Sequence, residues 1–359
     1  MNAKKWIKIW IIILIIIPMV GGFNYLTDSL GILNDKGYLD KAAKDLASGN
    51  MIAGLKNFDE RLFKKKVIEN IKDDIDWIAI GSSRTMQLRK RTFLKQNEKF
   101  HNYSVSGASL EDFIALVSIH IDNQGKLPKH IVLGIDPWIF NKYSGQNGYL
   151  SIVDDYNKLI SNINNKQNID LKPQYINKLF SIEYLIENFK FFMDNVNNKL
   201  KGYYIVNSIE IDARITELDG SIQYPYKYRR PSNIIVEEAA IKYTKGRVYA
   251  LDRFTKLNNL ELFKEFVLYL KDGGVDVVFF LPPYNPISYD LLLDNEKYLI
   301  INKVEKYLFD FAKKYNIKLF GSYNPHKYKL TSKDFFDGMH GKDIVYTRIF
   351  KNKSINKEH

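Results

Sequence analysis

Five short apolar runs, separated by segments of helical pattern, constrain the fold of this chain more than any other feature. The runs cover residues 77–80, 99–105, 130–135, 275–281 and 317–320. Helical pattern covers residues 59–71, 84–95, 109–121, 257–271 and 295–315. Because strands that alternate with helices build a parallel sheet covered on both faces, the sequence predicts an α/β domain with a central parallel sheet.

The segment from about residue 145 to residue 256 interrupts this alternation. It is rich in Asn, Lys and Tyr and has a mostly helical pattern. We interpret it as an insertion that lies over the carboxyl end of the sheet. The predicted division is therefore an α/β domain over residues 76–352, preceded by a juxtamembrane segment over residues 26–75 and followed by a tail at 353–359.

The first 25 residues predict a membrane anchor. Residues 9–20 carry no charge, and Lys4, Lys5 and Lys8 stand in front of them. A positively flanked apolar segment of this kind is either a signal peptide or an uncleaved signal anchor. Because no small-x-small cleavage site follows, we favour a single-pass anchor with the N-terminus in the cytoplasm and the remaining chain outside it.

Composition excludes several classes of site. The 359 residues include no cysteine, which rules out a thiol nucleophile, a disulfide framework and cysteine-ligated metals. No metal-ligand spacing and no nucleotide-binding loop is visible, so no metal or cofactor is predicted. The net charge of +12 is spread along the chain and accompanies no nucleic-acid-binding motif, so nucleic acid is not an expected partner.

Polar or turn-forming residues follow each of the five apolar runs. In chain order they are Ser82 and Ser83, Gly107, Asp136, Pro282 to Tyr284, and Asp337 to His340. The carboxyl ends of parallel strands meet at one edge of a sheet, and ligands bind there. The five loops are therefore expected to converge on one site, and this convergence is stronger evidence than any single motif.

Two of these loops carry the residue types of a nucleophile, a base and an orienting carboxylate. A serine hydroxyl needs a neighbouring base to attack, and the base needs a partner that fixes its orientation. In a tight loop Asp337 can reach one imidazole nitrogen of His340 while the other nitrogen faces Ser83. Each motif alone is more typical of a turn or a helix cap. Together, at the correct strand ends, they predict Ser83, Asp337 and His340 as catalytic residues.

These residues resemble the sequence blocks of the SGNH/GDSL hydrolase superfamily. Gly81-Ser82-Ser83 is similar to the first block, with Ser83 as nucleophile and Ser82 in place of the usual aspartate. Gly107 matches the glycine of the second block, and Asp337 to His340 matches the last. The resemblance implies a three-layer, flavodoxin-like fold and an oxyanion hole that includes the Gly107 backbone.

The third block departs from that family pattern. Asp136 stands where the family usually has asparagine. An amide donates a hydrogen bond to an oxyanion, whereas an ionised carboxylate repels it. The oxyanion hole then rests on the backbone N–H groups of Ser83 and Gly107, unless Asp136 is protonated or faces elsewhere. A turn residue before Pro137 is the alternative role for Asp136.

The whole pattern is most similar to membrane-anchored, extracytoplasmic members of the superfamily. These include the DltD group of teichoic-acid D-alanylation and the SGNH-like proteins of alginate or peptidoglycan acetylation. The resemblance implies serine-dependent acyl transfer to a cell-surface polymer, with a membrane-bound O-acyltransferase as partner. A surface carbohydrate esterase and a catalytically weak scaffold for such an acyltransferase remain the alternatives.

Three further features have both a functional and a structural interpretation. Arg84 is either a ligand for an anionic acceptor or a helix-surface arginine. Tyr284 either lines the substrate pocket or belongs to a rigid turn beside two prolines. The run from Tyr224 to Arg230 mixes aromatic and cationic side chains, which suits sugars and anions, but a plain surface loop is equally consistent with it.

Overall fold

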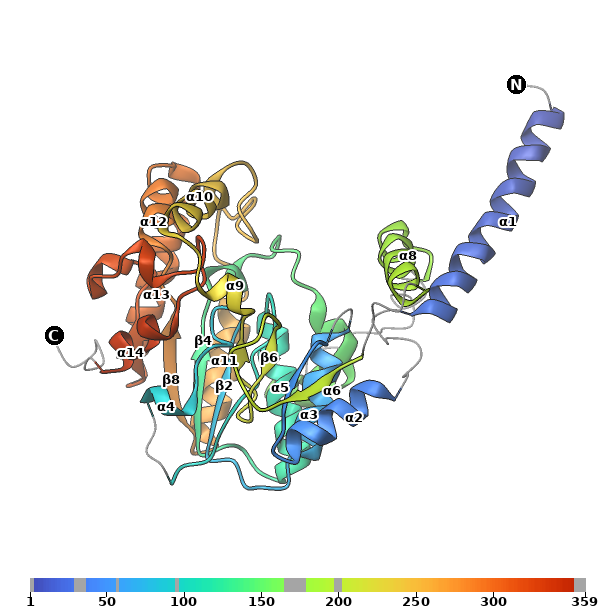
Figure 1. Ribbon diagram of the computed structural model, residues 1–359. Helices are drawn as coiled ribbons and strands as arrows, with labels where there is room; N and C mark the ends of the chain where they lie inside the picture. The colour runs from blue at the N-terminus through green and yellow to red at the C-terminus, as the bar shows by residue number, and fades with distance from the viewer. Residues whose placement is uncertain are drawn as a thin grey trace.

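A five-stranded parallel sheet forms the centre of the molecule (Figure 1). The computed structural model describes residues 3–28, 37–55, 58–93, 97–164, 179–196 and 202–351. The strands are β2 (Trp77–Ile80), β3 (Phe100–Asn102), β4 (His130–Gly134), β8 (Asp276–Leu281) and β9 (Lys318–Gly321). All five predicted strands are confirmed, and so is the α/β class with a central parallel sheet.

The strand order is β3-β2-β4-β8-β9. Numbered by their succession in this sheet, the strands run 2-1-3-4-5, which is the flavodoxin-like doubly wound order. The direction of winding reverses between β2 and β4, which pair in parallel from Trp77 with His130 to Ile80 with Leu133. In such sheets a ligand binds outside the carboxyl ends of the two strands at this switch point.

Alternate side chains of each strand enter two separate cores. Ile78, Ile131 and Phe279 pack on one face, whereas Ala79, Val132 and Val278 pack on the other. The first face is covered by α5 (Leu110–Gln124), α6 (Val153–Asn164), α11 (Leu260–Asp272) and α13 (Ile300–Lys314). The second face is covered by α14 (Asp343–Lys351), which also contacts the four-residue α4 (Lys90–Phe93). The sheet is therefore buried on both sides, as its apolar strands require.

Most of the predicted helices occur near the expected positions. α3 (Glu60–Asn70), α5 and α11 match their predicted ranges closely, and a capping box at Ser109 starts α5. The helix predicted over residues 295–315 is divided into a short 3-10 helix, Glu296–Tyr298, and α13. Further 3-10 helices are Pro137–Phe140, Gly148–Ile152, Pro325–Tyr328 and Ser332–Asp334.

The helix predicted over residues 84–95 is wrong for its first half. Residues 83–87 form turns, and the four-residue α4 begins only at Lys90. Distant side chains bond the carbonyl groups that such a helix would use internally. Asn102 donates to the carbonyls of Thr85 and Leu88 at 3.0 and 2.9 Å, and Tyr346 donates to the carbonyl of Arg84 at 2.9 Å.

A second, antiparallel sheet joins the N-terminal segment to the insertion. Its order is β5-β1-β6-β7, with β1 (Met51–Ala53), β5 (Tyr204–Val206), β6 (Ile215–Thr216) and β7 (Ile222–Gln223). The segment predicted as juxtamembrane thus contains β1 and α3 together with α2 (Tyr38–Ala47), whose Leu39 and Leu46 pack against Phe63 of α3. The insertion is predicted to be mostly helical, and the structure shows that it also contributes three of these strands, β5, β6 and β7.

The remaining helices of the insertion are α8 (Ile182–Val196), α9 (Tyr226–Arg229) and α10 (Asn233–Thr244). α10 packs against α12 (Pro286–Leu293), which follows β8 at the carboxyl edge of the main sheet (Figure 1). This part of the insertion therefore lies where the sequence places it. The predicted tail at 353–359 lies outside the described residues.

α1 (Ala3–Thr27) extends away from the α/β body with α8 beside it (Figure 1). The rings of Phe23 and Phe192 meet edge to face with centroids 6.0 Å apart. Within the described ranges, no helix is long and apolar enough to cross a membrane, so the predicted transmembrane helix is not supported.

Candidate active site

The Gly81-Ser82-Ser83 turn lies at the switch point of the main sheet. Ser83 follows β2 and is half-buried. Gly81 allows the turn to approach the neighbouring strand closely, because a Cβ atom there would lie 2.9 Å from the carbonyl oxygen of Gly134 at the end of β4. The carbonyl of Gly81 accepts a hydrogen bond from Val105 at 3.0 Å, which ties this turn to the loop after β3.

The Asp337–His340 segment forms a closed loop beyond β9. Phe335 and Gly341 form an isolated antiparallel bridge, and the Phe336 N–H donates to the His340 carbonyl at 2.9 Å. Asn285, at the start of α12, holds the loop from outside by donating to the carbonyl of Asp337 at 3.0 Å. The backbone of the loop is thus fixed independently of any ligand.

Ser83, His340 and Asp337 form a continuous hydrogen-bond chain. Ser83 Oγ lies 2.9 Å from His340 Nε2, and His340 Nδ1 lies 2.8 Å from Asp337 Oδ2. A carboxylate accepts only, so Nδ1 carries the proton and Nε2 is left to accept the proton of Ser83. The structure therefore brings the three predicted residues together in the arrangement of a nucleophile, a base and an orienting carboxylate.

Asp337 is held as a carboxylate by the groups around it. Its Oδ1 accepts from the N–H groups of Met339 and His340 at 2.8 and 2.9 Å. Burial would raise the pKa of Asp337, but His340 and these hydrogen bonds outweigh it and hold the pKa well below its usual range. The negative charge opposite the imidazole is therefore kept at every pH near neutrality.

Arg84 does not occupy the position predicted for an anion ligand. Its side chain is buried, and Nη1 bonds Asp136 Oδ1 at 2.7 Å. Nε donates to the carbonyl of Met339 at 3.1 Å, and Nη2 donates to the carbonyl of Pro282. The guanidinium is therefore a buried internal link between the serine turn, the histidine loop and the ends of β4 and β8.

Asp136 and Tyr284 belong to the same buried cluster. One oxygen of Asp136 pairs with Arg84, while the other has no hydrogen-bond partner among the described residues. Burial raises the pKa of Asp136, and the charge of Arg84 opposes that effect. The Tyr284 ring lies under the Arg84 guanidinium, 4.1 Å from centroid to Cζ, and is fully buried, which agrees with its interpretation as part of a rigid turn.

Gly107 lies at the end of the loop after β3 and has a left-handed backbone, with φ of 57°. A Cβ atom there would lie 2.1 Å from Gln146 Oε1 and 2.5 Å from the Tyr249 hydroxyl, so both side chains cover this glycine. Tyr249 in turn donates to Gln146 Oε1 at 3.1 Å. The sequence did not single out Gln146 or Tyr249, because neither belongs to a motif.

Two tyrosines of the insertion pack around the catalytic loop. Tyr228 donates its hydroxyl hydrogen bond to Asp337 Oδ2, and its ring stacks on Phe336 with centroids 5.3 Å apart. The Tyr224 ring meets that of His340 edge to face with centroids 6.0 Å apart. The aromatic run from Tyr224 to Arg230 was the only sequence signal for these contacts, and sugar or anion binding by this run stays a prediction.

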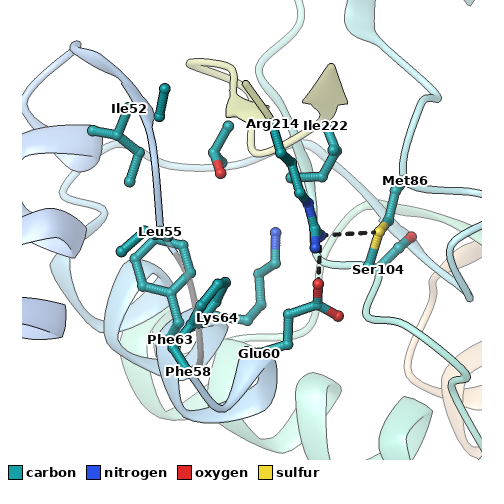
Figure 2. Close-up of a pocket in the computed structure, with 12 residues that line it drawn as sticks. Ile52, Leu55, Phe58, Glu60, Phe63, Lys64, Met86, Ser104, Arg214 and Ile222 are labelled. Carbon is teal, nitrogen blue, oxygen red and sulfur yellow. Dashed lines mark hydrogen bonds and ion pairs between the residues drawn. The ribbon is translucent and has the colours of Figure 1, made fainter. Parts of the chain in front are cut away.

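A separate pocket lies between α3 and the second sheet, and Figure 2 shows its lining. Glu60 and Arg214 form an ion pair on one side of it, facing Met86, while Phe58 and Phe63 form an apolar wall. The same carboxylate accepts a hydrogen bond from the N–H of Ser106, the residue before Gly107. The pocket does not include the Ser83 chain, but its ion pair supports the loop that carries Gly107.

Glu60 is expected to make the stability of the protein depend on pH. Burial would raise its pKa, but Arg214 and the Ser106 N–H outweigh burial and lower the pKa from 4.5 to about 2. Its contribution is therefore full above pH 4.5 and is lost as pH falls towards 2. Glu60→Gln should lower the free energy of unfolding at pH 7 by about 3 kcal/mol and flatten its decline in acid.

Urea unfolding from pH 7 to pH 3 measures this effect. Glu261→Gln is the matched control, because its side chain is 67% exposed in a surface pair with Lys264. That control should change stability by less than about 0.5 kcal/mol. If Glu60→Gln and Glu261→Gln had the same free energy of unfolding at pH 7, the Glu60–Arg214 ion pair would make no net contribution to stability.

No family model matches this chain, and no curated protein matches it. The resemblance to the SGNH/GDSL superfamily therefore rests on the residues quoted above.

Proposed function

We propose that this protein is an acyl-transferring enzyme that uses Ser83 as its nucleophile. The observation that carries the proposal is the Ser83–His340–Asp337 hydrogen-bond chain, with distances of 2.9 and 2.8 Å, at the switch point of a doubly wound sheet. A serine within hydrogen-bond reach of an imidazole that is oriented by a carboxylate is the general arrangement of serine-dependent acyl transfer.

The proposed reaction has two steps. In the first, His340 takes the proton of Ser83 while Oγ attacks the carbonyl carbon of an acyl donor, and the imidazolium returns that proton to the leaving oxygen. In the second, His340 deprotonates an incoming hydroxyl, which attacks the carbonyl carbon of the acyl-Ser83 ester, and the imidazolium returns that proton to Ser83 Oγ as the ester bond to Ser83 breaks. Asp337 fixes the tautomer and stabilises the imidazolium in both steps.

Backbone N–H groups are the proposed oxyanion ligands. The family asparagine would supply a side-chain donor, but Asp136 is directed to Arg84 and offers a carboxylate instead. This leaves the N–H groups of Ser83 and Gly107, whose loops are joined by the Val105-to-Gly81 hydrogen bond. The left-handed backbone of Gly107 is consistent with such a role.

The acceptor distinguishes a transferase from an esterase. We favour transfer to a hydroxyl of a cell-surface polymer (a polysaccharide, teichoic acid or peptidoglycan), with a membrane-bound O-acyltransferase as the source of the acyl group. This part rests on the sequence resemblance. The lysine-flanked apolar start of α1, whose Leu14 and Met19 remain exposed, supports a location at the cell membrane with the α/β domain outside the cytoplasm. With water as acceptor, the same residues would make a surface carbohydrate esterase.

A serine-reactive phosphonate tests the proposal directly. The full chain is treated with the phosphonate and the adduct is mapped by mass spectrometry. We expect an adduct on Ser83 that is absent in His340→Ala and retained in Ser106→Ala, an exposed serine of the neighbouring loop. Absence of any adduct on Ser83 would favour the third interpretation, a scaffold for a membrane acyltransferase. Polyol acceptors added with an activated ester then separate transfer from hydrolysis.

A further inference from the structure

The insertion contributes a side chain to the hydrogen bonding of the catalytic pair. α9 is a single turn, and its Tyr228 lies against the Asp337–His340 loop from outside. Stacking on Phe336, with planes 26° apart, and an edge contact with Tyr224 hold the ring of Tyr228 in place. Its hydroxyl is therefore positioned by packing rather than by the hydrogen bond alone.

Asp337 accepts four hydrogen bonds, two on each oxygen. Oδ1 takes both of its bonds from the backbone of its own loop, at Met339 and His340. Oδ2 takes one from His340 Nδ1 and one from the Tyr228 hydroxyl. Among the residues that the structure describes, Tyr228 is the one donor to Asp337 from outside the loop, and it shares the oxygen that orients the imidazole.

The Tyr228 hydroxyl remains a donor throughout the working range of pH. Burial and the adjacent charge of Asp337 raise the pKa of Tyr228 well above its usual value of 10. The other titratable groups near the pair are Tyr224, whose ring contacts His340, Asp136 and Arg84 behind the loop, and Tyr243 of α10. All four remain unchanged when only the Tyr228 hydroxyl is removed.

On the basis of the acyl-transfer function proposed above, we propose that Tyr228 is a positioning residue for His340. By donating to Asp337 Oδ2, it fixes the plane of the carboxylate and takes up part of its negative charge. Without this hydroxyl, the whole charge of Oδ2 acts on the imidazole and stabilises its protonated form. His340 then stays protonated to a higher pH, and a protonated imidazole cannot accept the proton of Ser83.

Tyr228→Phe tests the proposal, with Tyr224→Phe as the matched control. Both variants keep their rings, and Tyr224 packs on the same loop without bonding Asp337. In Tyr228→Phe we expect the acid limb of the kcat/KM profile to move up by about half a pH unit, and kcat at neutral pH to fall about 5- to 10-fold. KM should stay unchanged, and Tyr224→Phe should behave as the wild type.

Proton NMR titration of the His340 imidazole gives a readout that needs no turnover. A higher titration midpoint in Tyr228→Phe than in the wild type supports the positioning role even if no tested ester is turned over, in which case the acyl-transfer proposal alone fails. An unchanged midpoint together with an unchanged acid limb would overturn the positioning role. So would a loss of thermal stability unaccompanied by either shift, because a purely structural tyrosine has that effect.

Discussion

Replacing Ser83 by alanine is expected to reduce turnover of an activated ester by about 10,000-fold or more, with little change in KM. The variant lacks the only oxygen that the His340 Nε2 contacts in the chain described here, at 2.9 Å, so no acyl-enzyme ester can form. Residual activity would come from water activated by His340 and stabilised by the backbone N–H groups. The measurement is steady-state hydrolysis of a 4-nitrophenyl ester at pH 7.5.

His340→Ala should reduce turnover about as much as Ser83→Ala does. The double variant should turn over the ester no more slowly than either single variant. Residues that act as one catalytic unit show this non-additivity, whereas two independent contributions would multiply. Ser106→Ala is the control, since its exposed side chain lies in the neighbouring loop. If Ser83→Ala keeps more than a tenth of the wild-type rate, the nucleophile lies elsewhere and the serine mechanism is excluded.

The sequence predicts the sheet and the position of the site because both depend on local signals. Apolar runs such as residues 130–135 are too short and too β-branched for helices, and turn residues follow each of them. Strand ends in a parallel sheet share one edge, so Ser83 and His340 could be paired although 257 positions separate them. No knowledge of side-chain packing was needed for that step.

The errors occur where distant side chains override local preference. Residues 84–88 have a helical pattern, but Asn102 and Tyr346 bind their carbonyls and hold a series of turns. The strands of the second sheet have two or three residues each, too few to show an alternating pattern. The contact of Tyr228 with Asp337 spans 109 positions and follows no motif.

Arg84 shows the same limit within the site itself. A cation beside a nucleophile suggests an anionic substrate, and only the structure shows that Asp136, Met339 and Pro282 already occupy its donors. The sequence alone does not distinguish a buried ion pair from two separate site residues. It shows that Asp136 replaces the family asparagine, but it does not show that Arg84 is the partner of Asp136.

Introducing the family asparagine at Asp136 is expected to destabilise the protein, although a return to a family consensus residue usually stabilises one. Asp136→Asn should lower the free energy of unfolding by about 3–5 kcal/mol, because neutralising one partner leaves the Arg84 charge buried without compensation. Both side chains are at most 1% exposed, so water cannot replace the lost charge. Urea unfolding at pH 7 measures the loss.

The same variant should also lose activity, although it introduces the amide that an oxyanion hole would use. Arg84 Nε donates a hydrogen bond to the Met339 carbonyl at 3.1 Å, next to His340, so a displaced guanidinium disturbs the position of the His340 base.

Arg84→Gln combined with Asp136→Asn removes both charges and should regain part of the stability that Asp136→Asn loses, and a double-mutant cycle measures this coupling. A single Asp136→Asn variant that is as stable as the wild type and turns over faster would contradict this account. In that case the Asp136 carboxylate would only partly fill the role of the asparagine amide in the oxyanion hole. The expected coupling instead means that Asp136 and Arg84 stabilise the site as a pair, so that replacing either residue alone destabilises the protein.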